Sequence, residues 1–155
     1  MPTLYQAIAG VVNACQVLPN LVTGGQPGEA QLSALQAAGC EVILDVRSPG
    51  ERRGFDEPGL VRALGMEYVN IPIGEGPLTD ELLERVLAIL RLHGDQRIFF
   101  HCASGNRVGG PLIPYLMLDH TLSEEDAVGV AMRVGLRSPE LLQWGLTYAR
   151  RHERI

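Results

Sequence analysis

A cysteine and an arginine, Cys102 and Arg107, are separated by four residues in a short segment that contains a glycine. The segment follows an apolar run over residues 97–100, which predicts a buried strand, and precedes an apolar stretch over residues 108–118 that could begin a helix. A strand, a tight turn and a helix N-terminus direct backbone N–H groups and the positive end of a helix dipole to one point. We therefore expect an anion-binding loop in which Cys102 is a thiolate nucleophile and Arg107 binds the anion with its planar fork.

The residues around this pair complete the predicted anion-binding loop. Gly105 would supply a backbone conformation that is closed to other residues and so turn its N–H inward. The predicted loop also contains Ala103, Ser104, Asn106 and Val108.

The composition restricts how an anion could be held. The net charge is −5 and the pI is near 5.3, which argues against nucleic-acid or membrane-surface partners because both need a basic patch. All thirteen basic residues are arginine. The absence of lysine excludes a lysine Schiff base and a phosphate loop of the Gly-Lys-Ser/Thr type. An anion must therefore be held by arginine and backbone N–H groups at a local site.

The cysteine and histidine patterns predict no metal and no cofactor. Cys15, Cys40 and Cys102 are widely spaced and odd in number, so neither a disulfide framework nor a zinc site is indicated.

No apolar run has the length of a membrane span, and the apolar N-terminal stretch lacks the basic region of a signal peptide. We expect a cytoplasmic protein.

Strands and helices are predicted to alternate along the chain. Strands are expected over residues 21–23, 41–46, 68–73 and 97–101. Helices are expected over residues 4–16, 29–38 and 58–64, after Thr79, from residue 108, after Ser123 and after Ser138.

The apolar run at residues 41–46 is typical of a parallel strand covered on both faces. We therefore predict a three-layer α/β fold with a central, mostly parallel sheet flanked by helices. One domain would span residues 1–155, with a core over about residues 20–120 and a helical part over residues 121–155. Functional sites of such folds lie at the carboxyl ends of strands, which is where Cys102 falls. At the same edge, Asp45 and Arg47 are expected to form a structural pair.

Several short segments, in order, resemble those of a known family. They are Gly24-Gly25-Gln26-Pro27, Val42-Ile43-Leu44-Asp45-Val46-Arg47, Tyr68-Val69-Asn70-Ile71-Pro72, Pro77-Leu78-Thr79 and the Cys102 loop. Over roughly residues 20–120 the chain resembles the phosphatase-like domain of bacterial proteins named beta-lactamase-hydrolase-like, which has a dual-specificity-phosphatase fold. The resemblance implies this cysteine-phosphatase fold, and it implies that His101 orders the loop by hydrogen bonding. Asp45 is expected to support the loop.

The length of the loop differs from that of the phosphatases. Four residues separate Cys102 from Arg107, whereas the tyrosine and dual-specificity phosphatases have five. The shorter loop resembles that of the rhodaneses, whose tighter ring of N–H groups suits the outer sulfur of a persulfide. Val108 stands where the phosphatases have their arginine, and the segment over residues 45–51 resembles the Asp-Val-Arg stretch of the rhodaneses.

These features predict a sulfurtransferase, in which Cys102 takes sulfur from a small anionic donor as a persulfide and passes it to a thiol acceptor or cyanide. The first alternative is a cysteine phosphatase acting on a phosphoester, with Glu75 as the general acid because the phosphatases carry an acid shortly after an Ile-Pro pair. Three other acids could replace it: Asp56, Glu57 and Asp80. The second alternative is a non-catalytic binder of an anion or phosphopeptide. The sequence leaves the oligomeric state open.

Overall fold

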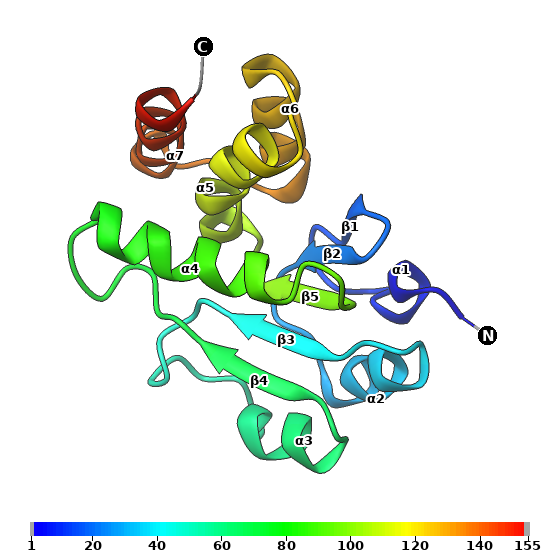
Figure 1. Cartoon of the computed structure of the whole chain (residues 1–155). Coiled ribbons are helices and arrows are strands. Elements are labelled where there is room, and N and C mark those ends of the chain that lie inside the picture. Colours follow the sequence, from blue (N-terminus) through cyan, green and yellow to red (C-terminus); the bar gives the residue numbers. More distant parts are fainter. Residues whose placement is uncertain (1, 154–155) are drawn as a thin grey trace.

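A five-stranded sheet forms the middle layer of the computed structural model, which describes residues 2–153 (Figure 1). Its strands are β1 (Cys15–Leu18), β2 (Leu21–Gly24), β3 (Val42–Asp45), β4 (Glu67–Asn70) and β5 (Ile98–His101), in the order β1-β2-β5-β3-β4. β1 is antiparallel to β2, and all other neighbouring strands are parallel. The predicted α/β fold with a mostly parallel central sheet is confirmed.

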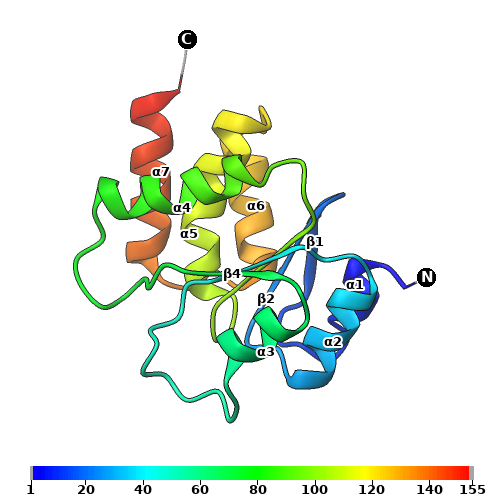
Figure 2. The same cartoon turned by 60° about the horizontal axis from the view of Figure 1, so that its bottom comes forward.

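Helices form the two outer layers (Figure 2). They are α1 (Leu4–Ala7), α2 (Glu29–Ala37), α3 (Glu57–Ala63), α4 (Asp80–Leu92), α5 (Asn106–Pro114), a π-helix (Tyr115–Asp119), α6 (Glu124–Val134) and α7 (Pro139–His152). α1 to α3 cover one face of the sheet and α4 to α7 the other. Adjacent residues of β5 serve the two cores: Phe99 packs on the first side and Phe100 on the second, both fully buried. Within residues 2–153, no helix is long and apolar enough to cross a membrane.

The long N-terminal helix predicted over residues 4–16 is wrong. Only Leu4–Ala7 is α-helical, and Cys15–Leu18 pairs with β2 as a strand. Gly10 and Asn13 have φ angles of 90° and 55°, which a right-handed helix cannot contain. Two of the apolar residues that suggested a helix are nevertheless buried: Ile8 and Val11 pack against the α2 side of the sheet.

A close contact between α5 and α7 depends on two facing glycines. A Cβ atom at Gly145 would lie 2.3 Å from the backbone oxygen of Gly110, so any side chain forces the helices apart. We expect Gly145→Ala to lower the free energy of unfolding by about 1–3 kcal/mol, measured by urea denaturation. Gly129→Ala on α6 is the matched control, because a Cβ there meets no heavy atom within 4 Å. It should raise the stability by up to about 1 kcal/mol through helix propensity. Equal stability of the two variants would contradict this packing.

Candidate active site

The parallel strands bring the predicted site together at one edge of the sheet. β5 ends at His101, which lies opposite Asp45 of β3 and Gly24 of β2. Residues 102–105 form the turn that follows, and α5 begins at Asn106. Cys102 therefore lies at the carboxyl edge of the strands, and Arg107 lies in the first turn of a helix.

Gly105 closes the turn in a conformation that few other residues adopt. Its φ angle is 94°, and a Cβ atom there would lie 2.1 Å from the backbone oxygen of Val134. In this conformation the Gly105 N–H donates to Cys102 Sγ at 3.0 Å. Such a contact stabilises a sulfur that carries negative charge.

The carbonyl groups of the turn point away from the cysteine. The oxygen of Ala103 accepts from the N–H of Gln26 at 3.1 Å, and that of Ser104 accepts from Asn13 Nδ2 at 2.7 Å. Within residues 2–153, the N–H groups of Ala103 and Ser104 donate to no protein acceptor. The carbonyl groups of the turn are thus bound by residues outside it, and its N–H groups remain available to an anion.

Two of the predicted loop residues have structural positions. The Oδ1 atom of Asn106 accepts from the backbone N–H groups of Arg137 and Ser138 at 2.7 and 3.1 Å, which ties the loop to the start of α7. Val108 is fully buried in the core on the α4–α7 side of the sheet. The side chain of Val108 is therefore turned away from the turn, and its predicted part in the anion-binding loop would fall to its backbone N–H group.

Arg107 is held by Glu51, which lies on the loop after β3. Glu51 Oε2 and Oε1 accept from the two terminal nitrogens of Arg107 at 2.8 and 2.9 Å. Glu51 also accepts from Arg47 Nε at 3.0 Å and from the Ser48 N–H at 2.7 Å. The hydrogen bonds from Arg107 hold the pKa of Glu51 far below its usual range and raise the pKa of Arg107 in turn. Cys102 is buried next to this arrangement, with 1% of its surface exposed.

His101 is fully buried between two acceptors. Its Nδ1 lies 3.0 Å from the Cys102 carbonyl oxygen, and its Nε2 lies 2.6 Å from Glu57 Oε2. When Glu57 is ionised, both partners are acceptors, so both ring nitrogens donate and the ring is an imidazolium. Burial alone would lower the pKa of His101, but the hydrogen bond and the charge of Glu57 outweigh it and raise this pKa. Likewise, burial acts to raise the pKa of Glu57, and His101 lowers it on balance.

The side chain of Asp45 binds Arg53 and Tyr68. Its Oδ2 accepts from Arg53 at 2.6 Å and from the Tyr68 hydroxyl at 2.7 Å. From Arg47 it accepts only the backbone N–H, at 2.8 Å, because the Arg47 side chain turns to Glu51. Asp45 and Arg47 are thus joined through the Arg47 backbone, whereas the charged side chain that pairs with Asp45 is Arg53.

Asp45, Glu57 and His101 lie close enough to suggest a metal site, since one ligand atom of each falls within 4.8 Å of the others. Their polar atoms, however, already receive hydrogens from Arg53, Tyr68 and one another. An imidazolium cannot ligate a metal. The cluster is a neutralised ion-pair network, and its donor set does not fit a cation.

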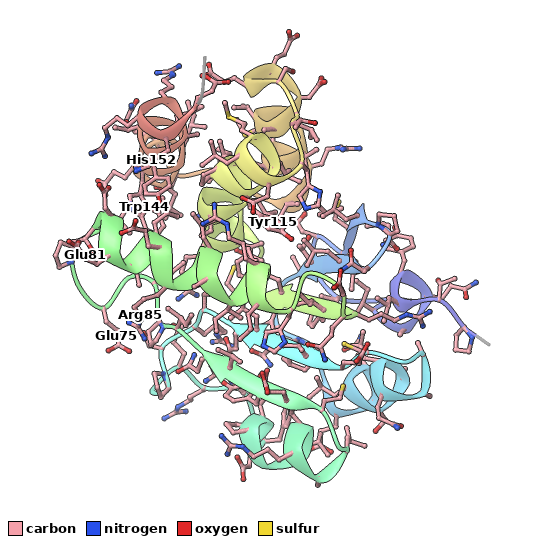
Figure 3. All side chains as sticks on the ribbon, in the orientation of Figure 1. Glu75, Glu81, Arg85, Tyr115, Trp144 and His152 are labelled. Carbon is pink, nitrogen blue, oxygen red and sulfur yellow. The ribbon has the colours of Figure 1, made fainter. Side chains whose placement is uncertain are left out.

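Glu75, the predicted general acid, lies exposed on the loop between β4 and α4, at the left edge of the view in Figure 3. The loop starts at the site, because the Ile73 carbonyl oxygen accepts from Arg107 at 3.5 Å. The three alternative acids are engaged elsewhere: Asp56 caps α3, Glu57 binds His101, and Asp80 pairs with Arg151.

The other two cysteines are far from Cys102. Cys40 lies before β3, at the opposite edge of the sheet, and burial raises the pKa of its thiol to about 12. Cys15 is two strands from β5, a lateral separation of about 10 Å, which exceeds the reach of a disulfide. Neither thiol is placed to resolve an oxidised or persulfidated Cys102.

The chain matches no protein-family model and no curated protein. Several solved structures have the same fold. A DUF442 protein from Shewanella putrefaciens CN-32, provisionally named a phosphatase, aligns over 96% of this chain and 98% of its own, with 22% identity and a TM-score of 0.82. Tk-PTP in its active form aligns over 91% of this chain and 98% of its own, with 19% identity and a TM-score of 0.71.

A third structure carries a ligand. A cysteine-to-serine variant of P. aeruginosa TpbA in complex with pTyr aligns over 89% of this chain and 91% of its own, with 14% identity and a TM-score of 0.67. The fold of this chain is therefore that of the tyrosine and dual-specificity phosphatases. These structures support the phosphatase part of the predicted resemblance, and they lend no support to its beta-lactamase-hydrolase and rhodanese parts.

Proposed function

We propose that this chain is a cysteine-dependent phosphatase acting on a phosphomonoester. The observation that carries the proposal is the convergence of Cys102 Sγ, outward-turned carbonyl groups and Arg107 on one turn of a phosphatase fold. The complex of TpbA with pTyr supports a phosphomonoester as the substrate class. This reading takes the phosphatase alternative over the predicted sulfurtransferase.

The proposed reaction has two steps on the same sulfur. The Cys102 thiolate attacks phosphorus, a sulfur–phosphorus bond forms, and the bond to the leaving oxygen breaks as an acid supplies a proton. Arg107 and the free N–H groups of the turn bind the equatorial oxygens, where negative charge increases. Water then attacks phosphorus, gives up a proton to the same acid, and releases phosphate and the thiolate.

Two assays on the wild-type protein separate the candidate functions. We expect release of nitrophenolate from p-nitrophenyl phosphate, with competitive inhibition by orthovanadate, and no formation of thiocyanate from thiosulfate and cyanide. Thiocyanate formation without phosphate release would restore the predicted sulfurtransferase. Orthovanadate binding without either turnover would indicate the non-catalytic binder.

Glu75 is the acid that we propose for the first step. Because phenolate is a poorer leaving group than nitrophenolate, its departure depends more on a proton. Glu75→Gln should therefore lower kcat on phenyl phosphate by about 10²-fold and should affect p-nitrophenyl phosphate much less. Glu81→Gln is the matched control, an exposed carboxylate on the first turn of α4 (Figure 3). Equal effects of Glu75→Gln on the two esters would remove Glu75 from this role.

A further inference from the structure

Two pairs of charged residues, His101–Glu57 and Arg47–Glu51, lie at the two ends of the Cys102 turn. Behind the cysteine, His101 donates to the Cys102 carbonyl oxygen and to Glu57, whose side chain is fully buried. At the other end, Arg107 donates to Glu51, which also accepts from Arg47. The pairs come from different parts of the chain: Glu57 begins α3, whereas Arg47 and Glu51 belong to the loop after β3.

The pairing with Glu51 decides which edge of Arg107 is available. Both terminal nitrogens of the guanidinium donate to the Glu51 carboxylate, so Glu51 occupies the end edge of the fork. A guanidinium has five N–H donors in a rigid plane, and its side edge, formed by Nε and one terminal nitrogen, can still hold two oxygens. Glu51 therefore sets the rotation of Arg107 and with it the direction of the side edge.

Gln26 joins the two pairs. Its Nε2 donates to Glu57 Oε1 at 2.6 Å, and its Oε1 accepts from the Arg47 terminal nitrogen at 2.7 Å. An amide is the side chain that can donate to a carboxylate and accept from a guanidinium at the same time. Hydrogen bonds thus run without a break from the Cys102 carbonyl group to the Arg107 guanidinium.

We propose that Gln26 is a positioning residue: it links the His101–Glu57 pair to the Arg47–Glu51 pair and so fixes the edge of Arg107 that receives an oxyanion. Gln26 acts through Arg47 and Glu51, since the side-chain hydrogen bonds of Gln26 within residues 2–153 go to Pro27, Glu57 and Arg47. The proposal rests on the oxyanion-binding role of Arg107 in the proposed function, but its test does not need turnover.

The test compares the alkylation of Cys102 by iodoacetate and by iodoacetamide, with the modified residue identified by peptide mass spectrometry. In both reactions the thiolate displaces iodide, but only iodoacetate carries a carboxylate for Arg107 to bind. The ratio of the two rates therefore measures the placement of Arg107. Gln26→Met keeps the size of the side chain and removes the hydrogen bonds to Glu57 and Arg47 together with a local one to the Pro27 carbonyl oxygen. We expect this ratio to fall roughly three- to tenfold.

A double variant shows whether Gln26 acts through Glu51. Glu51→Gln should lower the ratio as well, and Gln26→Met combined with Glu51→Gln should lower it little further, because the two residues lie on one path. The matched control is Gln143→Met, which removes an exposed hydrogen bond to Thr147 on α7. The control should retain the wild-type ratio.

Exchanging the amide and the carboxylate between positions 26 and 57 tests whether the ratio of alkylation rates can be rescued. Gln26→Glu alone places a second carboxylate against Glu57 and should lower the ratio, whereas Gln26→Glu with Glu57→Gln restores one donor and one acceptor at this contact and should recover part of it. An unchanged ratio in folded Gln26→Met, or strictly additive effects with Glu51→Gln, would overturn the proposal. A fall in the ratio without any phosphatase turnover would instead support the positioning role and contradict the proposed function.

Discussion

Cys102→Ser is expected to abolish phosphate-ester turnover, with a loss of about 10⁴-fold or more in kcat. A serine hydroxyl stays protonated at neutral pH unless a base lies beside it. The N–H of Gly105, which forms a hydrogen bond to Cys102 Sγ, is a donor and cannot take a proton. The variant should still bind orthophosphate, because Arg107 and the turn N–H groups remain, and this can be measured by isothermal titration calorimetry.

Cys15→Ser is the matched control for that result. Cys15 is half-buried on β1, where it packs against the core and its thiol donates to the carbonyl group of the next residue. Its replacement should leave turnover unchanged. A loss of activity in Cys15→Ser, or turnover in Cys102→Ser within tenfold of wild type, would contradict the assignment of the nucleophile.

Removing the carboxylate of Glu57 is expected to produce the largest loss of stability, about 3–5 kcal/mol for Glu57→Ala. Glu57 is fully buried and is the partner of both His101 and Arg53, at 2.6 and 3.2 Å. Its loss leaves the buried His101 without a hydrogen-bonded carboxylate and leaves Arg53 with Asp45 as its remaining buried carboxylate. Urea denaturation at neutral pH measures the effect. A loss below about 1 kcal/mol, the range of a surface ion pair, would show that these charges are solvated.

The pair of His101 and Glu57 predicts that the free energy of unfolding is maximal over a limited range of pH. The pKa of Glu57 is lowered in the folded state, so its contribution is present above its ordinary value of 4.5 and is lost as the pH falls through the folded value. The pKa of His101 is raised above 6.5, so its contribution is complete below 6.5 and is lost as the pH rises through the folded value. Urea denaturation across the pH range should show a decline on both sides, and Glu57→Gln should weaken both declines.

The elements that present the nucleophile are predictable because local signals agree on them. The apolar run of β5, the glycine at position 105 and the polar start of α5 place Cys102 at a sheet edge from sequence alone. α4 is equally clear, with Thr79 as its cap and a continuous apolar stripe. The segment over residues 4–16 is different, because its apolar spacing is helical while two residues with positive φ angles interrupt it.

The polar residues that hold the loop are not predictable in the same way. Glu51 and Glu57 lie in a polar stretch that looks like a solvated loop, and Gln26 precedes a proline and a glycine. Their partners are chosen by the sheet, which brings β2, β3 and β5 to one edge. The local signal in this stretch is the resemblance of residues 45–51 to the Asp-Val-Arg stretch of the rhodaneses, and it does not indicate that Glu51 binds Arg107.

Loop length and fold point to different chemistries. The four-residue spacing between Cys102 and Arg107 favoured sulfur transfer, whereas the arrangement of the strands and helices agrees with solved cysteine phosphatases. The length of the turn changes the number and spacing of the N–H groups around the anion. The nucleophile and the guanidinium are common to both chemistries, so the covalent intermediate must decide between them.

The intact mass of rapidly quenched wild-type protein tests this central claim most directly. After mixing with p-nitrophenyl phosphate, the account predicts a phosphoryl adduct of about 80 Da that maps to Cys102 and is absent from Cys102→Ser. After mixing with thiosulfate, it predicts no change in mass. A gain of about 32 Da with thiosulfate, together with no adduct from the phosphate ester, would contradict the account and identify Cys102 as a persulfide carrier.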